Sequence, residues 1–200
     1  MSTARANSIV HPRNLVVAGV FSCVYFVVMF ASGFLGVFTP AMMFVGGVIG
    51  ILINSMVIML YLAKVPCFGA FTILGAVLGL GMVVTGHVWF TVIVSIILGV
   101  IADSIAYAGK YRKAVLNSLG FAVFNLWTLA PLAPIFYNAD EYFRYVAESM
   151  DSVDYAETMR NLFTPTVIIV WTCIAFVITF LAGLMGMRVL AKHFSRAGVV

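Results

Sequence analysis

The chain has 200 residues, of which 64% are hydrophobic and only 9% are charged. A soluble globular domain carries about a quarter of its residues as charges, so the composition excludes that class and predicts an integral membrane protein. The formal net charge of +4 could suit nucleic acid, but the basic residues lie in short clusters between apolar runs. That pattern sets the orientation of membrane helices instead, and we expect no nucleic-acid partner.

Apolar runs bounded by Pro, Gly or charged residues predict six membrane spans, each close to the roughly 20 residues that cross a bilayer. Twice a Thr-Pro pair opens a span, at Thr39-Pro40 and Thr164-Pro165, as expected for an N-cap followed by proline. The first run is longer than the core of a signal peptide, so we interpret it as a true helix. The chain is therefore predicted to form one all-α domain, residues 1–200, whose bundle has spans at about 15–35, 41–62, 68–85, 89–107, 114–135 and 165–190.

The charges predict the orientation of these spans. With the N-terminus in the cytoplasm, nine of the eleven basic residues fall inside and only Arg144 and Arg160 fall outside. Six of the seven acidic residues crowd the last external loop, and only Asp103 lies near the inner face. This bias follows the positive-inside rule and predicts cytoplasmic N- and C-termini.

The external loop between the last two spans, about residues 137–163, is too long for a simple connection. Asn138, with Glu141 three residues later, resembles a capping box at a helix start. Apolar residues then recur at helical spacing, which predicts one or two amphipathic helices over the mouth of the bundle. Either a lid over a binding site or a helix resting on lipid headgroups fits this pattern.

Motifs for catalysis are missing from the sequence. There is no phosphate-binding loop, and Gly109-Lys110 is followed by Tyr111 rather than Ser or Thr. No metalloprotease or serine-hydrolase motif occurs, the three cysteines are scattered, and no charged residue lies in the middle of a span. We therefore expect no enzyme, no metal site and no ion-coupled carrier.

A few polar and aromatic residues are candidates for ligand contact near the predicted outer ends of the spans. His87 and Trp89 share a glycine break between two spans, where they could stack on a flat ligand, hold a metal or simply form part of the interfacial aromatic belt. Asn125 and Asn54 are amides inside spans and need hydrogen-bond partners, which could be another helix or a ligand. The ligand-binding candidates are His87, Trp89, Asn125, Trp127, Tyr137 and Tyr142.

Small residues and one acid suggest further contacts. Ala18 and Ser22 form a small-xxx-small pair in the first span, as Gly75 and Gly79 do in the third, and such pairs let helices approach closely. Either pair could serve a partner protein or the bundle itself. For Asp103 we expect an ion pair with a basic residue of the inner face.

Several stretches together resemble a known family of membrane proteins. They are VVMF at 27–30, YLAK at 61–64, TGHVW at 85–89, GVIAD at 99–103, GKY at 109–111, LW at 126–127 with Pro131 and Pro134, and VLAKHF at 189–194. As a set, they resemble the Trep_Strep (MptD) family of substrate-binding S components of energy-coupling-factor (ECF) transporters. The resemblance covers nearly the whole chain.

The resemblance implies a bacterial cytoplasmic-membrane protein that captures a scarce micronutrient from outside. Such a protein would dock onto a transmembrane coupling subunit (T component) with two cytoplasmic ATPases, which use the ATP, so it needs no cofactor of its own. Docking in that family uses an A-x-x-x-A-type motif in the first helix, and the matching residues here are Ala18 and Ser22. The ligand could be a vitamin-like molecule or a metal chelate such as a haem-like compound. A self-sufficient carrier or channel and a ligand-free scaffold are the alternative functions.

Overall fold

The computed structural model describes the backbone of residues 8–194 and the side chains of residues 8–192. Within this range all regular secondary structure is helical, and there is no strand. Its elements in order are α2 (Pro12–Gly33), η1 (Phe34–Val37), α3 (Met42–Lys64), α4 (Ala70–Val84), α5 (Thr91–Ala108), α6 (Ala114–Phe124), η2 (Asn125–Leu132), α7 (Pro134–Tyr137), α8 (Ala139–Ser149), α9 (Val153–Leu162) and α10 (Pro165–Phe194).

Five helical segments of the described chain are long and apolar enough to cross a membrane. They are Pro12–Val37, Met42–Lys64, Thr91–Ala108, Ala114–Leu132 and Pro165–Lys192. Helix α4, which corresponds to the third predicted span, has only 15 residues. The fifth predicted span is α-helical only to Phe124 and continues as the 3-10 helix η2, which contains Pro131. Proline has no N–H group for the helical hydrogen-bond ladder, so the regular helix does not extend through it.

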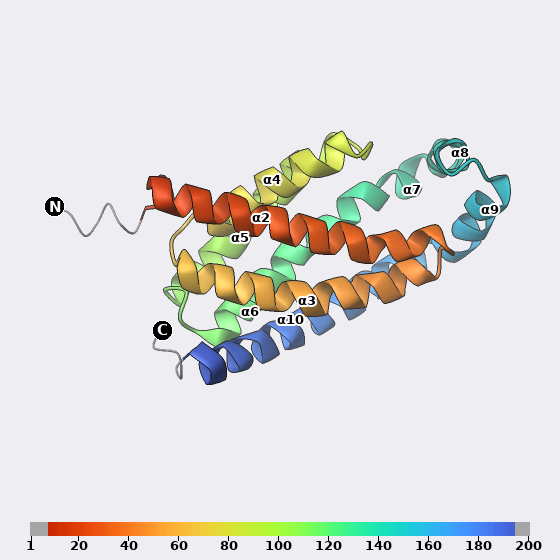
Figure 1. The fold of residues 1–200 in the computed structure, drawn as a ribbon. Coiled ribbons are helices and arrows are strands. Elements are labelled where there is room, and N and C mark those ends of the chain that lie inside the picture. The colour runs from red at the N-terminus through yellow and green to blue at the C-terminus, as the bar shows by residue number, and fades with distance from the viewer. Residues whose placement is uncertain (1–7, 195–200) are drawn as a thin grey trace.

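The long helices and α4 pack into a closed ring. In space the order is α2, α3, α10, α6, α5, α4 and back to α2 (Figure 1). The main apolar core lies inside this ring and includes Tyr61, Phe71, Leu74 and Phe121. Helices with apolar faces on all sides suit a bilayer, and large apolar side chains remain exposed on the outside of the ring.

Glycines allow α4 and α5 to approach closely. A Cβ atom on Gly75 would lie 2.3 Å from the Ser95 carbonyl oxygen, and one on Gly79 would lie 2.6 Å from Val92 Cα. Ser95 Oγ donates a hydrogen bond to the Gly75 carbonyl, 2.7 Å away. The Gly75/Gly79 pair therefore serves packing inside the bundle.

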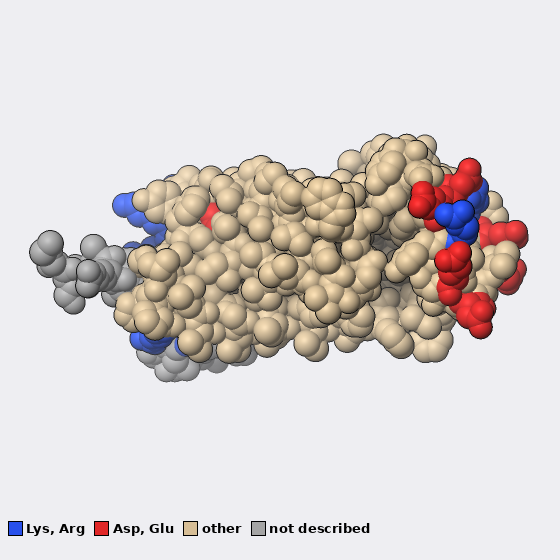
Figure 2. All heavy atoms as spheres, turned by 90° about the horizontal axis from the view of Figure 1, so that it is seen from above, with Lys and Arg blue, Asp and Glu red and all other residues tan. Residues whose placement is uncertain are grey.

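The two ends of the bundle carry opposite charge. Six carboxylates and the two arginines Arg144 and Arg160 lie at the end covered by α8 and α9, which we call the acidic end (Figure 2). Lys and Arg side chains gather at the opposite end, which we call the basic end (Figure 2). The described Lys and Arg residues outside the segment of α8 and α9 are Arg13, Lys64, Lys110, Arg112, Lys113, Arg188 and Lys192. Arg5 and Arg196, which the prediction of orientation also counts as cytoplasmic, lie outside the described residues.

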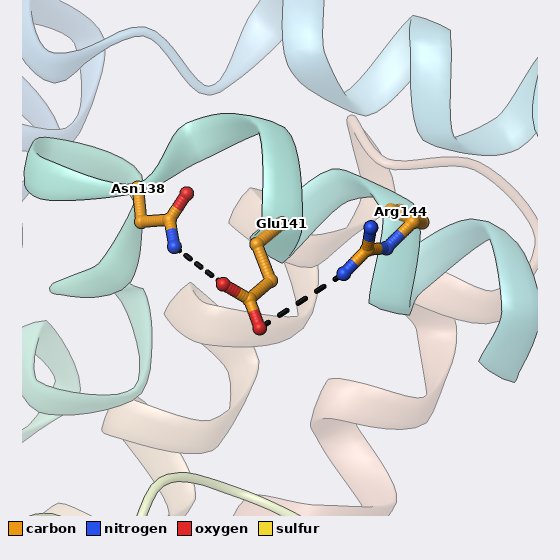
Figure 3. Close-up of polar contacts among 3 residues, drawn as sticks. All are labelled: Asn138, Glu141 and Arg144. Atoms are coloured by element: carbon orange, nitrogen blue, oxygen red, sulfur yellow. Dashed lines mark hydrogen bonds and ion pairs between the residues drawn. The ribbon is translucent and has the colours of Figure 1, made fainter.

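Helices α8 and α9 lie across the acidic end of the ring and form what we call the α8–α9 layer (Figure 1). Their apolar faces pack in a separate cluster centred on Phe143, Met159 and Phe163. Asn138 precedes α8, but its side chain makes no capping bond to the backbone. It donates a hydrogen bond to the Glu141 carboxylate instead, and Glu141 lies 4.0 Å from Arg144 (Figure 3).

Asp103 makes no ion pair with a described residue, so the prediction that it pairs with a basic residue of the inner face is wrong. Its carboxylate is fully buried and accepts hydrogen bonds from the backbone N–H groups of Gly69, Phe71 and Thr72 at 2.9–3.1 Å. The hydroxyls of Thr72 and Tyr111 donate to it as well, at 2.7 and 3.0 Å. A carboxylate from α5 thus caps the first turn of α4, whose unpaired N–H groups attract negative charge.

Candidate functional site

A cavity of about 510 Å³ lies inside the ring near its acidic end. Its walls come from α2, η1, α3, the end of α4, the α4–α5 loop, α6, η2, the α8–α9 layer and α10. The surface is hollowed beside the acidic residues (Figure 2). The volume falls within the range of small-molecule sites, about 300–1,000 Å³. The ring and the α8–α9 layer therefore form a partly open space that suits a ligand of moderate size.

Aromatic and methionine side chains make up much of the cavity wall. Phe44 stacks on Phe163 with ring centroids 5.1 Å apart and meets Trp171 edge-on at 4.9 Å. The other aromatic and methionine side chains in the wall are Tyr25, Met29, Phe30, Phe34, Met43, Met82, Phe121, Trp127, Tyr142, Met150 and Tyr155. Such a wall offers flat apolar surfaces and adaptable thioethers.

Most polar groups of the wall already bond to neighbours. Trp127 Nε1 donates to Tyr25 Oη at 3.3 Å, and the hydroxyls of Ser32 and Thr128 donate to carbonyls of their own helices. Asn54 Nδ2 donates to the Tyr25 carbonyl at 3.3 Å, but Asn54 Oδ1 has no hydrogen-bond partner among the described residues. Asn54 therefore lines the cavity with a buried acceptor whose hydrogen-bonding capacity is unsatisfied among the described residues.

Of the six residues predicted to contact ligand, the structure places His87, Asn125, Trp127 and Tyr142 in the cavity wall. Trp89 does not line the cavity: it is 70% exposed and lies edge-on against Phe90. Tyr137, at the end of α7, is also 70% exposed and outside the wall.

The titratable groups at the cavity mouth favour their neutral forms. Partial removal of the His87 ring from water lowers its pKa from the ordinary 6.5, although its bond to Met82 opposes the shift. His87 Nδ1 lies 3.2 Å from Thr85 Oγ1. Burial raises the pKa of Tyr142 to about 12 and raises the pKa of Tyr155 in the same direction. Desolvation penalises the charged form in each case.

Two tyrosines join the α8–α9 layer to the loops around the cavity. Tyr155 Oη of α9 donates to the Gly36 carbonyl in η1 at 2.6 Å. Tyr145 Oη of α8 donates to the Gly86 carbonyl in the α4–α5 loop at 3.2 Å. Within the layer, Arg160 pairs with Asp140 at 2.7 Å and lies over the Phe143 ring. The layer is thus held to both loops that contribute to the cavity.

Sequence patterns carry no signal for several wall residues. Tyr25, Phe44 and Trp171 lie in uniformly apolar runs, where no period separates a cavity face from a lipid face. The pair that the family resemblance assigns to docking is not on the surface. Ala18 and Ser22 have no exposed surface, so this face of α2 packs inside the ring and presents nothing to a docking partner in this structure.

The chain matches the sequence model of a known protein family over most of its length. The sequence model of a family described as hypothetical bacterial integral membrane protein (Trep_Strep) matches residues 12–196. This match covers nearly all of the chain. The protein belongs to the Trep_Strep family. Neither the curated proteins nor the solved structures include a match to this Trep_Strep chain.

Proposed function

We propose that this Trep_Strep protein is the substrate-capturing S component of an ECF-type importer. It would bind a small micronutrient from outside and pass it to a coupling subunit driven by two cytoplasmic ATPases. The observation that carries the proposal is the cavity of about 510 Å³, which opens at the surface and is lined by the helical ring and the α8–α9 layer. Its volume and largely apolar, aromatic wall are those of a small-molecule site, and a scaffold protein has no need of one.

The charge distribution supports capture from outside. The cavity lies at the acidic end, and the positive-inside rule assigns the basic end to the cytoplasm. We therefore infer a multi-pass protein of the bacterial cytoplasmic membrane whose two termini are cytoplasmic. The mouth of the cavity then faces the source of the nutrient.

The partners follow from chemistry that this chain lacks. Its sequence contains no phosphate-binding loop, so we infer that ATP is used by partner subunits and that the chain itself is no enzyme and needs no cofactor. The resemblance to S components supplies the T component and the ATPase pair as partners. Because Ala18 and Ser22 are buried, the docking surface belongs to another part of the ring.

Native mass spectrometry of the protein, purified gently from its own host, tests the proposal. We expect a complex that contains the chain, a coupling subunit, two ATPase subunits and a bound small molecule. Uptake by the chain alone in liposomes would contradict the proposal and support a self-sufficient carrier. Repeated recovery of a bare chain without ligand or partners would contradict it too and would favour a scaffold.

A further inference from the structure

The cavity wall contains no charged side chain. No Lys, Arg, Asp or Glu is among its described lining residues, and the basic residues at the acidic end are engaged elsewhere, Arg160 with Asp140 and Arg144 near Glu141. The one lining histidine, His87, has a pKa that desolvation lowers. A buried ion without a partner of opposite charge costs several kcal/mol, so the wall disfavours anions and cations alike.

The same wall keeps a small set of unused hydrogen-bonding groups. Asn54 is 2% exposed, and its Oδ1 is a buried acceptor with no partner in the described chain. The Asn125 side-chain amide, also in the wall, makes no hydrogen bond with a described residue. Tyr25 Oη accepts from Trp127 and retains its own proton for donation. A ligand that satisfies these groups needs both donors and acceptors on one edge.

We propose that the cavity binds an electrically neutral, flat heteroaromatic molecule whose ring N–H group donates a hydrogen bond to Asn54 Oδ1. The aromatic wall supplies stacking surfaces for the ring system. The neutral wall discriminates against carboxylate-bearing compounds, including haem-like chelates with their acidic side chains. The ligand class rests on the proposed function in one respect only, that the cavity is the ligand-binding site.

Intrinsic fluorescence provides a direct readout. The chain has three tryptophans, of which Trp127 and Trp171 line the cavity and Trp89 does not. In a Trp89→Phe background the fluorescence therefore reports on the cavity alone. The isolated chain is titrated in detergent with two probe scaffolds of different size, quinazoline-2,4-dione and alloxazine. Each is used as the neutral N–H parent, the N-methylated derivative, a carboxylate derivative and an ammonium derivative.

We expect at least one neutral parent to quench the fluorescence saturably and to raise the thermal unfolding temperature. Loss of one good hydrogen bond corresponds to about a tenfold change in affinity, so the N-methylated form should bind about tenfold more weakly. The carboxylate and ammonium forms should bind more weakly still. Equal or tighter binding of either ionic form overturns the proposal, as does the absence of saturable binding by both parents up to about 1 mM, a limit that corresponds to negligible affinity.

Asn54→Leu and Asn117→Leu form a matched pair of variants. Both asparagines are buried, donate Nδ2 to a tyrosine carbonyl and have an Oδ1 without a partner among the described residues, but only Asn54 lines the cavity. We expect Asn54→Leu to abolish the preference for the N–H parent over its N-methylated form, and Asn117→Leu to keep it. An unchanged preference in Asn54→Leu overturns the role of Asn54. Should Asn54→Leu fail to fold, the comparison of the two probes on the unmutated site still decides.

The result is independent of the transport partners. Binding is measured on the isolated chain, so a native complex without coupling subunits would overturn the ECF role and leave the ligand class standing. A native complex with those subunits, combined with preferred binding of the ionic probes, would support the ECF role and overturn the ligand class.

Discussion

Asp103 illustrates how a single buried carboxylate organises the basic end of the bundle. It lies on α5 but accepts hydrogen bonds from the start of α4, so it links two helices that also pack closely through Gly75. The sequence predicts an ion pair there, because basic residues follow Asp103 within a few turns. The exposed backbone N–H groups of a helix N-terminus are an equally good partner for an anion, and no sequence pattern reveals that choice.

Removing one donor to this carboxylate should destabilise the fold measurably. Tyr111 is buried and its hydroxyl donates to Asp103 at 3.0 Å, so Tyr111→Phe should lower the free energy of unfolding by about 1–2 kcal/mol. Thermal unfolding in detergent measures the effect. Tyr107→Phe is the control, since Tyr107 is exposed and its loss should change stability by less than about 0.5 kcal/mol. Equal effects of the two variants would show that the Tyr111 hydroxyl does not support the cap.

His87 gives a second prediction at this scale, in the pH dependence of stability. Desolvation lowers its pKa below 6.5, so the unfolded chain takes up a proton at a higher pH than the folded chain does. Acidification therefore favours unfolding, and stability should fall between about pH 7.5 and about pH 5.5. His87→Gln should flatten this dependence in thermal scans across that range. An identical slope in the variant would contradict a lowered pKa of His87.

At the scale of elements, the α8–α9 layer shows where sequence patterns were sufficient. The predicted apolar face, including Tyr142, Phe143 and Met159, packs as a cluster under the layer, because a helix at a surface must bury one face and the spacing of its apolar residues shows which. The long spans carry no such information. Their side chains are apolar all round, so the sequence could not distinguish Tyr25, which lines the cavity, from the neighbouring Phe26, which does not.

Tyr155 should hold the layer closed over the cavity. Its hydroxyl bonds to the Gly36 carbonyl at 2.6 Å, and a lost hydrogen bond is worth about 0.5–1.5 kcal/mol, or about a threefold to tenfold change in an opening equilibrium. Tyr155→Phe should therefore raise amide hydrogen exchange across residues 139–162 by that factor, as read by mass spectrometry. Tyr137→Phe is the matched control, because Tyr137 is exposed and outside the cavity wall. Unchanged exchange in Tyr155→Phe would mean that apolar packing alone holds the layer.

At the scale of the whole molecule, the separation of charge predicts the orientation. The test uses a background in which Cys23, Cys67 and Cys173 are replaced by Ala. Glu148 and Arg112 are both exposed and lie at opposite ends. In intact cells a membrane-impermeant maleimide should label Glu148→Cys, and it should label Arg112→Cys only after permeabilisation. The reverse labelling pattern would contradict the predicted orientation and would show that the cavity mouth faces the cytoplasm.

The sequence by itself determined that the protein is a helical membrane protein. It also determined approximately where the apolar segments lie and which faces of α8 and α9 are apolar. Each of these is local: it depends on the composition and period of a single segment. The tertiary structure alone decided that Asp103 caps α4, that Ala18 and Ser22 face inward, and that Asn54 and Trp171 meet at one cavity. These features depend on which face of one apolar helix meets another, and a helix that is apolar all round leaves that choice to packing between segments far apart in the chain.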